Sequence, residues 1–436
     1  MPIFTLQQES GKLEDIEILK SKMIIGRNET CEIKILGGDI SREHACVTID
    51  KDNCFIDDLD SRNGTYVNAT PITEKTKLKH MDVVQIGKNT LMYSDNDISV
   101  ESEKYDHSAP VGQSHSQLFN FDFLQEVIFK LEGNIGKIIK GKTDVIKNLI
   151  IALLSDGHIL IEDVPGVGKS MLARVLAKSI LGNYRRIQFS PDMLPSDITG
   201  INVYNKKTKD FTFMPGPIFG NIILADEINR TTPRTQSSLL ECMSEATITI
   251  DGQQHVLPKP FFVIATQNPS DYHGTYPLPK PQLDRFLMKI SVGYPEINTE
   301  KEILSSQMER HPINEISHIV KAMDIVLCQA LVRKTYVSDV IREYIVKIVN
   351  ATRNHPAIEQ GGSPRASLAL MRTSQTIAAY NGRDFVVPND VRNLTIPVLA
   401  HRLTFRARAR NEWDNVETVI ESIVDNTQMP EEHLEK

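Results

Sequence analysis

The hydrophobic positions of residues 1–96 form short runs that alternate with polar residues, and glycine, asparagine or aspartate separates one run from the next. Alternation with a period of two is typical of half-buried β-strands, and frequent turns between such runs are typical of a β-sandwich. We therefore predict an all-β sandwich, with strands in the segments IFTLQ, DIEIL, MIIGR, CEIKI, HACVTID, CFIDDL, GTYVN, DVVQIG and TLMYS.

The pattern changes twice further along the chain. Residues 97–117 are polar, rich in serine and without apolar periodicity, which predicts a flexible linker. Residues 118–295 combine helical periodicity with buried strands such as HILIEDV, RRIQF, NIILADE and FFVIATQNP, which predicts an α/β domain. Residues 296–436 contain few strand patterns, and segments such as SDVIREYIVKIVNATRN predict an all-α region with a C-terminal tail.

Composition and charge narrow the class of protein. A content of 40% hydrophobic and 24% charged residues is ordinary for a globular chain. No apolar run approaches the roughly 20 residues that span a bilayer, and the start lacks the features of a signal peptide, so we expect a cytoplasmic protein without membrane insertion. The net charge of −7 argues against nucleic acid as a partner, so recognition of phosphate has to come from individually placed residues.

The five cysteines are odd in number and irregular in spacing, which argues against a disulfide framework. Cys31, His44, Cys46 and Cys54 together suggest a zinc site as one interpretation. They contain no pair with the short spacing of zinc ligands, and three of them lie in alternating strand-like sequence, so buried apolar cysteines are the favoured interpretation.

Four short polar elements follow one another in the β-rich segment: Gly26-Arg27, Ser41-Arg42-Glu43-His44, Asn63-Gly64 and Asn68. An arginine can direct two N–H donors onto phosphate oxygens, and a serine hydroxyl can donate a further hydrogen bond. Alone, Asn63-Gly64 is equally a simple turn and Arg27 a surface charge. All four elements in this order resemble the forkhead-associated (FHA) domain, over residues 1–96.

The resemblance to FHA domains implies binding of a phosphothreonine-containing protein. The phosphopeptide-binding residues that it implies are Arg27, Ser41, Arg42, Asn63 and Asn68; Asn63 would hold the peptide backbone and Asn68 would brace its loop. His44 is expected to order the loop rather than touch the ligand. The linker contains serines but no threonine, so we expect a partner protein, or a threonine of another subunit, to dock there.

The strand HILIEDV leads directly into a glycine-containing loop and a helix, MLARVLAKSIL. Glycines let backbone N–H groups curl around phosphate, a lysine reaches the outer phosphates of ATP, and a hydroxyl can ligate Mg²⁺. The segment resembles a Walker A loop, whose cofactor-binding residues here are Pro165, Gly166, Val167, Gly168, Lys169 and Ser170. It departs from that pattern at Asp163, which replaces the first glycine and is expected to shape the entry to the loop.

The apolar strand NIILADE ends in two carboxylates, Asp226 and Glu227, as a Walker B strand does. Asp226 is expected to help hold Mg²⁺ through its hydration shell, and Glu227 to polarise the attacking water. Because Lys169 and both acids are present, we predict an ATPase rather than a non-hydrolysing scaffold.

Three stretches resemble the MoxR branch of AAA+ ATPases: IQFSPDMLPSDITG, FMPGPIFGNIILADEINRTTPRTQSSLLECMSE, and ATQNP followed by GTYPLPKPQLDRF. The resemblance covers residues 130–292 and a helical lid through about residue 405. It implies Asn268 as sensor 1, Arg285 as an arginine finger acting on the neighbouring subunit, and Arg365 as sensor 2, in cis or in trans. It also implies that Ile139 and Gly141 lie near adenine.

The same resemblance implies two protrusions facing a central channel. One is an insertion at about residues 197–217, and the other is a hairpin, for which alternating residues around Asp251-Gly252 are direct support. MoxR-type proteins are chaperone-like ATPases, generally homo-hexamers, often with partners that carry von Willebrand factor A domains. We therefore predict a ring that remodels or matures partner proteins after recruitment through phosphothreonine.

Two other functions stay open. A nucleic-acid-dependent ring motor is suggested by the hairpin and by the basic tract RLTFRARAR, residues 402–410, although a helix face or a subunit contact is the favoured interpretation of that tract. The second is a nucleotide-gated signalling scaffold whose output is the phosphopeptide-binding domain.

Overall fold

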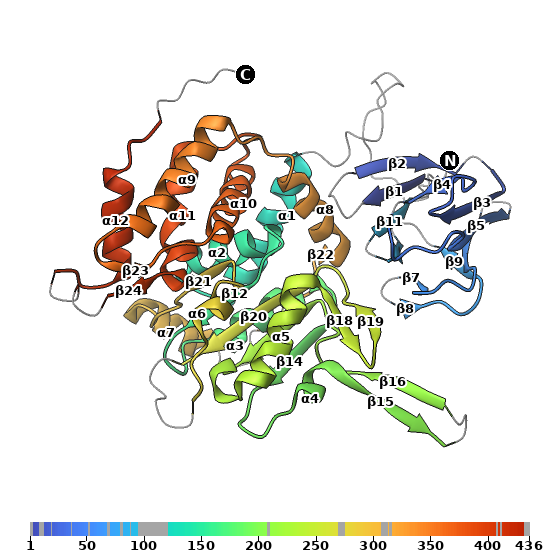
Figure 1. Cartoon of the computed structure of the whole chain (residues 1–436), viewed down its shortest axis with the longest axis horizontal. Coiled ribbons are helices and arrows are strands. Elements are labelled where there is room, and N and C mark those ends of the chain that lie inside the picture. Colours follow the sequence, from blue (N-terminus) through green and yellow to red (C-terminus); the bar gives the residue numbers. More distant parts are fainter. Residues whose placement is uncertain are drawn as a thin grey trace. The chain divides into compact units, whose positions relative to one another are not determined.

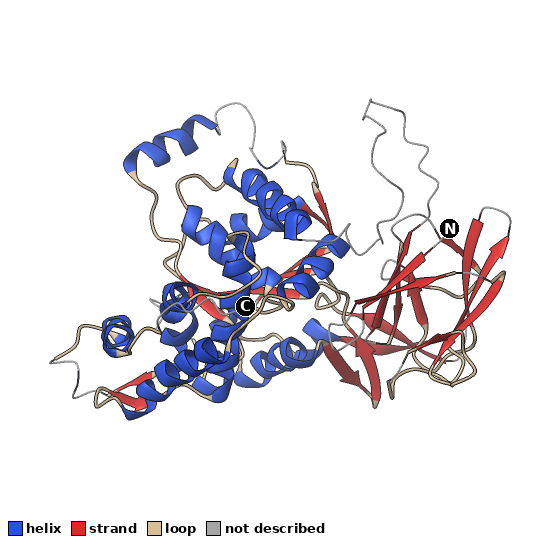
Figure 2. Ribbon diagram, turned by 90° about the horizontal axis from the view of Figure 1, so that it is seen from above, coloured by secondary structure: helices blue, strands red, loops and turns tan. Residues whose placement is uncertain are grey.

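The computed structural model of the protein describes residues 3–7, 13–18, 20–35, 37–50, 53–67, 70–78, 82–87, 89–94, 121–206, 210–268, 275–306, 313, 316–406, 409 and 412–430. The chain forms two compact units, Met1–Leu118 (unit 1) and Phe119–Lys436 (unit 2). Unit 1 is built from strands, whereas most of unit 2 is helical (Figure 2). The expected linker at 97–117 lies outside the described residues.

Unit 1 contains two β-sheets (Figure 1). The six-stranded sheet has the order β2-β1-β11-β10-β7-β8, with the bounds Leu13–Glu17, Ile3–Gln7, Asn89–Ser94, Val83–Ile86, Thr65–Val67 and Thr70–Pro71. The five-stranded sheet has the order β4-β3-β5-β6-β9, with the bounds Ile33–Lys34, Lys22–Gly26, Ala45–Asp50, Asn53–Asp58 and Thr76–Leu78. Neighbouring strands are antiparallel except β3 and β4, and the predicted all-β architecture is confirmed.

The core of unit 1 follows the alternation of its strands. In β6, Cys54 and Ile56 are buried while Phe55 between them is partly exposed, because successive side chains of a strand point to opposite faces. Cys31 and Cys46 are also buried, and none of the three cysteines forms a disulfide. The preferred interpretation of these cysteines as buried apolar residues is therefore confirmed.

Unit 2 is organised around a parallel five-stranded sheet in the order β14-β17-β20-β12-β21, with the bounds Tyr184–Gln188, Ile222–Asp226, Phe262–Gln267, Ile159–Glu162 and Met288–Ile290. Every residue of β17 is buried, as expected for a parallel strand covered on both faces. Because the strands are parallel, the loops that follow β12, β17 and β20 emerge at one edge of the sheet, where ligands of open α/β sheets bind.

Helices pack on both faces of this sheet (Figure 1). Ile222 and Leu224 of β17 belong to one hydrophobic core with the helices of the C-terminal region, whereas Ile223 and Ala225 face a second core. Packing is therefore continuous across the proposed core–lid boundary at residue 295. The helices are α1 Phe121–Gly136, α2 Thr143–Leu154, α3 Lys169–Ser179, α4 Pro195–Thr199, η2 Ile228–Arg230, α5 Pro233–Glu245, α6 Lys280–Leu283, α7 Ile297–Ser306, α8 Ala322–Val332, α9 Asp339–Asn354, α10 Pro364–Tyr380, α11 Pro388–Leu399, η4 Ala400–Arg402 and α12 Val416–Asn426.

Two antiparallel hairpins extend from unit 2, β15 (Gly200–Asn205) with β16 (Asp210–Pro215), and β18 (Thr247–Ile250) with β19 (Gln253–Val256). The second turns at Asp251 and Gly252, whose φ values of 48° and 81° match the backbone twist that a two-residue hairpin requires. The remaining strands are short pairs, β13 (Ile180–Leu181) with β22 (Val320–Lys321) and β23 (Ile358–Gln360) with β24 (Thr404–Phe405). Among the described residues, no helix is long and apolar enough to cross a bilayer.

Candidate ATPase site and phosphopeptide-binding loops

A glycine-containing loop joins β12 to the first turn of α3. Gly166 and Gly168 have φ values of 86° and 91°, and open space surrounds the position of a Cβ atom at either residue. Glycine is therefore required at both positions by the backbone conformation rather than by packing. Pro165 is exposed and Val167 partly exposed in the same loop, and α3 begins at Lys169, so backbone N–H groups of a helix start face solvent where a phosphate can bind.

Lys169 lies between the ends of three neighbouring strands. Its Nζ atom donates to the carbonyl oxygen of Asp163 at 2.6 Å and to that of Gln267 at 3.4 Å. Burial lowers the pKa of this amine, while the nearby carboxylates of Asp163, Asp226 and Glu227 oppose the change. The lysine is thus a cation held next to the acids at the carboxyl edge of the sheet.

Asp226 ends β17 and is buried, and its carboxylate accepts hydrogen bonds at both oxygens. Oδ1 accepts from the Thr266 hydroxyl at 2.6 Å. Oδ2 accepts from the Ser170 hydroxyl at 3.2 Å and from Nη2 of Arg186 at 2.6 Å. The contact with Ser170 joins the two residues expected to hold Mg²⁺. Thr266 and Arg186 were not predicted from the sequence. They could have been found only by knowing that β20 and β14, which carry them, are the strands beside β17.

Glu227 follows Asp226 in a left-handed conformation, with φ 58° and ψ 49°. Such a backbone is uncommon for a residue other than glycine and stores strain. Gln188 Nε2 donates to Glu227 Oε2 at 2.9 Å, and Arg230 Nε lies 3.2 Å from the same oxygen. The turn therefore directs the second acid away from the strand, toward two further polar side chains that the sequence interpretation did not include.

Asp163, which replaces the first glycine of a Walker A loop, anchors a distant turn. Its Oδ2 accepts hydrogen bonds from Ser291 Oγ at 2.8 Å, Val292 N at 2.7 Å and Gly293 N at 2.6 Å. Burial raises the pKa of this carboxyl, but the hydrogen bonds from Gly293 and its neighbours together lower it by more. The pKa of Asp163 therefore lies below the ordinary value. Asp163 thus ties the start of the phosphate loop to the segment between β21 and α7.

The remaining predicted residues of unit 2 lie at several places. Asn268 is buried directly after β20, and Gly141 approaches α7 with φ 66°, where a Cβ atom would come within 2.9 Å of Thr299 Oγ1. Arg285 instead contacts the end of α5, donating from Nη1 to the Leu240 carbonyl at 2.6 Å and to Ser244 Oγ at 2.8 Å. Arg365 is exposed in the first turn of α10. Among the described residues, it has no contact with Asp226 or Glu227.

The helix-face interpretation of the basic tract at residues 402–410 is wrong over its described part, whereas the alternative, a subunit contact, stays a prediction. Arg402 ends the short η4 and is buried, and β24 follows it. Arg402 Nε donates to Asp284 Oδ1 at 2.9 Å, and Arg406 Nε donates to the Ile358 carbonyl at 2.9 Å. Arg402 is therefore used inside the fold, because a buried charge needs a partner of its own, whereas Arg406 is partly buried.

In unit 1, His44 is fully buried and joins two loops. Its Nδ1 accepts from Ser41 N at 3.1 Å, so Nε2, 3.1 Å from the Gly64 carbonyl, carries the proton and donates. Burial lowers the pKa of this imidazole, in keeping with the neutral form. His44 therefore orders the loops from within. Gly26 allows the loops to approach, since a Cβ atom there would lie 2.3 Å from the Arg42 carbonyl.

The polar side chains expected to bind phosphopeptide surround this pair of loops. Ser41 Oγ accepts from Arg62 N at 3.1 Å, which leaves its proton free to donate, and Asn63 Nδ2 donates to the Asp39 carbonyl at 2.6 Å. Arg27 and Arg42 are exposed, and Arg27 N donates to the Ser41 carbonyl at 3.1 Å. The loops thus bring together four of the five predicted residues; the fifth, Asn68, lies outside the described residues.

A phosphate loop, two carboxylates at the neighbouring strand end and a helical C-terminal region define unit 2 as a P-loop ATPase of the AAA class. Residues 158–288 match the family described as "ATPase family associated with various cellular activities (AAA)", residues 350–423 match the AAA lid domain, and residues 23–87 match the FHA domain.

Individual relatives give the branch of that class. The chain is 47% identical over 307 residues to "Uncharacterized protein YeaC" of Bacillus subtilis, covering 70% of this chain and 96% of that one. It is 36% identical over 334 residues to "Chaperone MoxR1" of Mycobacterium tuberculosis, covering 74% and 87%. A crystal structure from Cytophaga hutchinsonii, assigned as an ATPase, is 35% identical with a TM-score of 0.67, covering 72% and 98%. The chain belongs to the MoxR family of AAA+ ATPases, with an FHA domain in unit 1, and hydrolyses ATP.

Proposed function

We propose that the protein couples ATP hydrolysis to chaperone-like remodelling or maturation of partner proteins, which it recruits through phosphothreonine. The proposal is supported by one observation: the same chain contains residues able to hydrolyse ATP and a second unit whose loops carry donors able to bind phosphate. Lys169, Asp226 and Glu227 supply the first, and Arg27 and Ser41 supply the second.

At the nucleotide, the phosphates would bind the loop from Pro165 to Ser170, with Lys169 Nζ as the cation that meets the outer phosphates. The residues present fit Mg²⁺, because a hydroxyl and a carboxylate oxygen, Ser170 Oγ and Asp226 Oδ2, lie 3.2 Å apart at the strand edge. When bound, Mg²⁺ supplies charge neutralisation on the phosphates. Gly141, which packs closely against Thr299 of α7, is the proposed neighbour of adenine.

Glu227 is the proposed general base that orients the attacking water, and Asn268, buried at the end of the adjacent strand, is the proposed sensor of the γ-phosphate. Arg285 would act on the neighbouring subunit, because its contacts within the chain are with α5 rather than with the acids. A trans contribution of this kind requires a ring, for which we propose a homo-hexamer. Arg365 at the start of α10 is the proposed contact of the lid with nucleotide.

The hairpin of β15 and β16 is the proposed contact with a client. Its exposed apolar side chains are unusual for a surface hairpin and are typical of interaction sites: Ile201 (48% exposed), Tyr204 (50%), Phe211 (66%) and Met214 (57%). The hairpin is linked to the second one, since the rings of Phe213 and His255 stack with centroids 4.2 Å apart and Asn202 Nδ2 donates to Asp251 Oδ2 at 2.8 Å. The two hairpins would therefore move together.

Unit 1 would select the client. Arg27 can fork onto a phosphate, the free proton of Ser41 Oγ can add a hydrogen bond, and Asn63 and Arg42 flank the same loops. We propose a cytoplasmic phosphothreonine protein as the partner, and a von Willebrand factor A domain protein as a second partner implied by the family resemblance.

The ATPase part is tested with Glu227→Gln, which keeps the shape of the side chain but removes the base. We expect the variant to bind ATP with unchanged affinity and to lose hydrolysis on the order of 100-fold or more. Specific activity of the wild type should rise with protein concentration as rings assemble. Wild-type turnover equal to that of the variant would contradict the assigned chemistry, and constant specific activity would contradict the ring.

Recruitment is tested by calorimetry with phosphothreonine peptides. We expect micromolar affinity, abolished by Arg27→Ala but unchanged by Lys77→Ala, which removes an exposed cation from β9. Equal affinity for the unphosphorylated peptide would refute the binding mode. Proteins retained by Glu227→Gln in the presence of ATP, and lost when Arg27→Ala is added, are the expected clients.

A further inference from the structure

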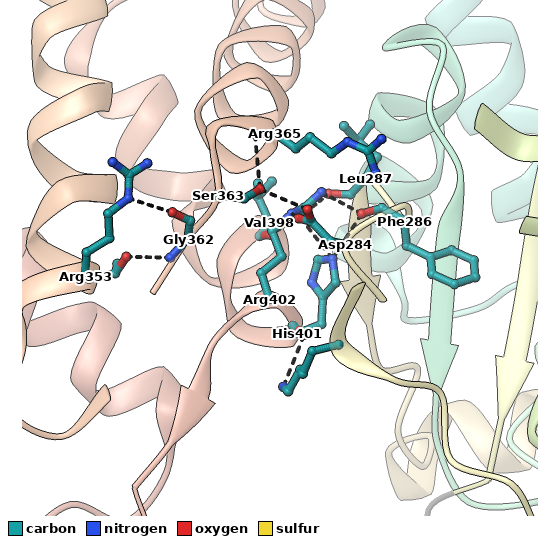
Figure 3. Close-up of polar contacts among 12 residues, drawn as sticks. Asp284, Phe286, Leu287, Arg353, Gly362, Ser363, Arg365, Val398, His401 and Arg402 are labelled. Atoms are coloured by element: carbon teal, nitrogen blue, oxygen red, sulfur yellow. Dashed lines mark hydrogen bonds and ion pairs between the residues drawn. The ribbon is translucent and has the colours of Figure 1, made fainter. Parts of the chain in front are cut away.

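A buried cluster of polar residues joins the segment that carries Arg285 to the lid (Figure 3). At its centre is the guanidinium of Arg402, whose side chain is 3% exposed. Arg402 Nε donates to Asp284 Oδ1 at 2.9 Å, and the side chain of Asp284 is 18% exposed. Neither residue belongs to the set that the nucleotide chemistry uses.

Arg402 contacts the residues on both sides of Arg285. On the N-terminal side it binds the carboxylate of Asp284. On the C-terminal side, Nη2 donates to the Phe286 carbonyl at 2.7 Å and Nη1 donates to the Leu287 carbonyl at 3.1 Å. Because the guanidinium is planar and its donors have fixed directions, these contacts restrict the path of the chain through Arg285.

The second oxygen of Asp284 connects this segment to α10. Ser363 caps that helix, accepting from Arg365 N at 3.2 Å, and its hydroxyl donates to Asp284 Oδ2 at 2.9 Å (Figure 3). The carboxylate of Asp284 thus contacts both Arg402 and Ser363. Ser363 caps the helical turn that carries Arg365. The positive charge of Arg365 is itself close enough to lower the pKa of Arg402 slightly.

The burial of this ion pair indicates a geometric role. Burial lowers the pKa of Arg402 to about 10, and Asp284 opposes the change. A buried ion pair contributes little to stability compared with an apolar pair of the same volume, since desolvation offsets the attraction. Its directional hydrogen bonds, by contrast, hold two backbone segments in one relative position. These segments are 79 residues apart in sequence at Asp284 and Ser363.

We propose that Asp284, Arg402 and Ser363 are positioning residues that join the Arg285 segment to the nucleotide-contacting end of α10. Through this cluster, the position of the start of α10, which carries Arg365, sets the position in which the same subunit presents Arg285 to its neighbour. The inference rests on the proposed function, in which Arg285 acts in trans within a ring. It assigns the placement of Arg285 at the subunit interface to one partly buried carboxylate.

The test uses rings mixed from two kinds of full-length subunit. A Glu227→Gln subunit cannot hydrolyse ATP but has Arg285 to donate, and an Arg285→Ala subunit can hydrolyse ATP only if a neighbour donates the arginine. Mixing them should restore hydrolysis. Adding Ser363→Ala to the donating Glu227→Gln subunit should lower the restored kcat roughly tenfold or more, since misplacement by about 1 Å costs on the order of 100-fold.

Ser338→Ala is the matched control, because Ser338 caps α9 in the same way, accepting from Ile341 N, but has no contact with Asp284. It should leave the restored activity unchanged when placed in the donating subunit, and Ser363→Thr, which keeps the hydroxyl, should rescue the Ser363→Ala defect. If mixing restores activity and Ser363→Ala in the donor has no effect, the coupling is overturned. If mixing restores nothing, the trans role of Arg285 fails, and the coupling fails with it.

Discussion

Replacing Asp163 by glycine restores the residue usual at this position of a Walker A loop, and we expect it to damage the protein. The change removes three hydrogen bonds to Asp163 Oδ2, from Ser291 Oγ, Val292 N and Gly293 N, with lengths between 2.6 and 2.8 Å. It also removes the hydrogen bond from Val164 N to Asp163 Oδ1, so three backbone N–H groups lose their acceptor. A nearby Asp-to-Gly change, Asp156→Gly, serves as a control.

The magnitude follows from these contacts. A hydrogen bond to a charged group contributes about 1.5–3 kcal/mol, but the three donors share one oxygen and water can replace part of the loss, so the total stays below the sum. Glycine adds about 0.5–1 kcal/mol through backbone freedom in the unfolded chain. We therefore expect the free energy of unfolding of unit 2 to fall by about 3–4 kcal/mol, and the affinity for ATP to fall with it.

Urea denaturation followed by the fluorescence of Trp413, the single tryptophan of the chain, reports on unit 2. Asp156→Gly should lower the free energy of unfolding by less than about 1 kcal/mol. Asp156 has φ 54°, a conformation that glycine adopts easily, and its ion pair with Arg333 is exposed to solvent. Calorimetry with ATP completes the measurement. If Asp163→Gly is as stable as the wild type and binds ATP as tightly or more tightly, the anchoring role of Asp163 is wrong.

Two further predictions concern buried or close-packed positions. Burial lowers the pKa of His158, so the unfolded chain binds the proton first and the free energy of unfolding decreases as the pH falls below about 6.5. The substitution His158→Gln can keep both hydrogen bonds of the ring. In urea titrations it should reduce the pH dependence of the free energy of unfolding by up to about 1.4 kcal/mol per pH unit. An unchanged slope would contradict the neutral imidazole. In unit 1, Gly26→Ala places a Cβ atom 2.3 Å from the Arg42 carbonyl, so phosphopeptide affinity measured by calorimetry should fall on the order of tenfold or more, whereas Gly38→Ala, with open space around it, should have no effect. Equal affinities would show that the loop can move aside.

Local sequence predicted those parts of the site that depend on a few consecutive residues. The left-handed glycines of the phosphate loop, the turn at Asp251 and Gly252 and the acids at the end of β17 each follow from the chemistry of adjacent residues. The sandwich of unit 1 followed from alternation alone, because one face of each strand has to be buried.

Contacts between distant segments were not predictable in this way. Thr266 and Arg186 reach Asp226 only because the sheet order places β20 and β14 on either side of β17. The tract that begins at Arg402 was interpreted as a helix face or subunit contact, yet Arg402 is buried against Asp284, 118 residues away. A run of basic residues does not reveal which of its members is enclosed.

The sequence by itself therefore determined the chemical groups available and the local backbone that presents them: a phosphate loop, two acids, and a set of donors on loops of a sandwich. The tertiary structure decided which of these groups bind one another and which lie at the same strand edge. It brought Asp163 to partners 128 to 130 residues away along the chain, and Asp284 to Ser363, 79 residues away. The reason is physical, since φ and ψ preferences act over a few residues, whereas burial and ion pairing depend on which segments the hydrophobic core brings together.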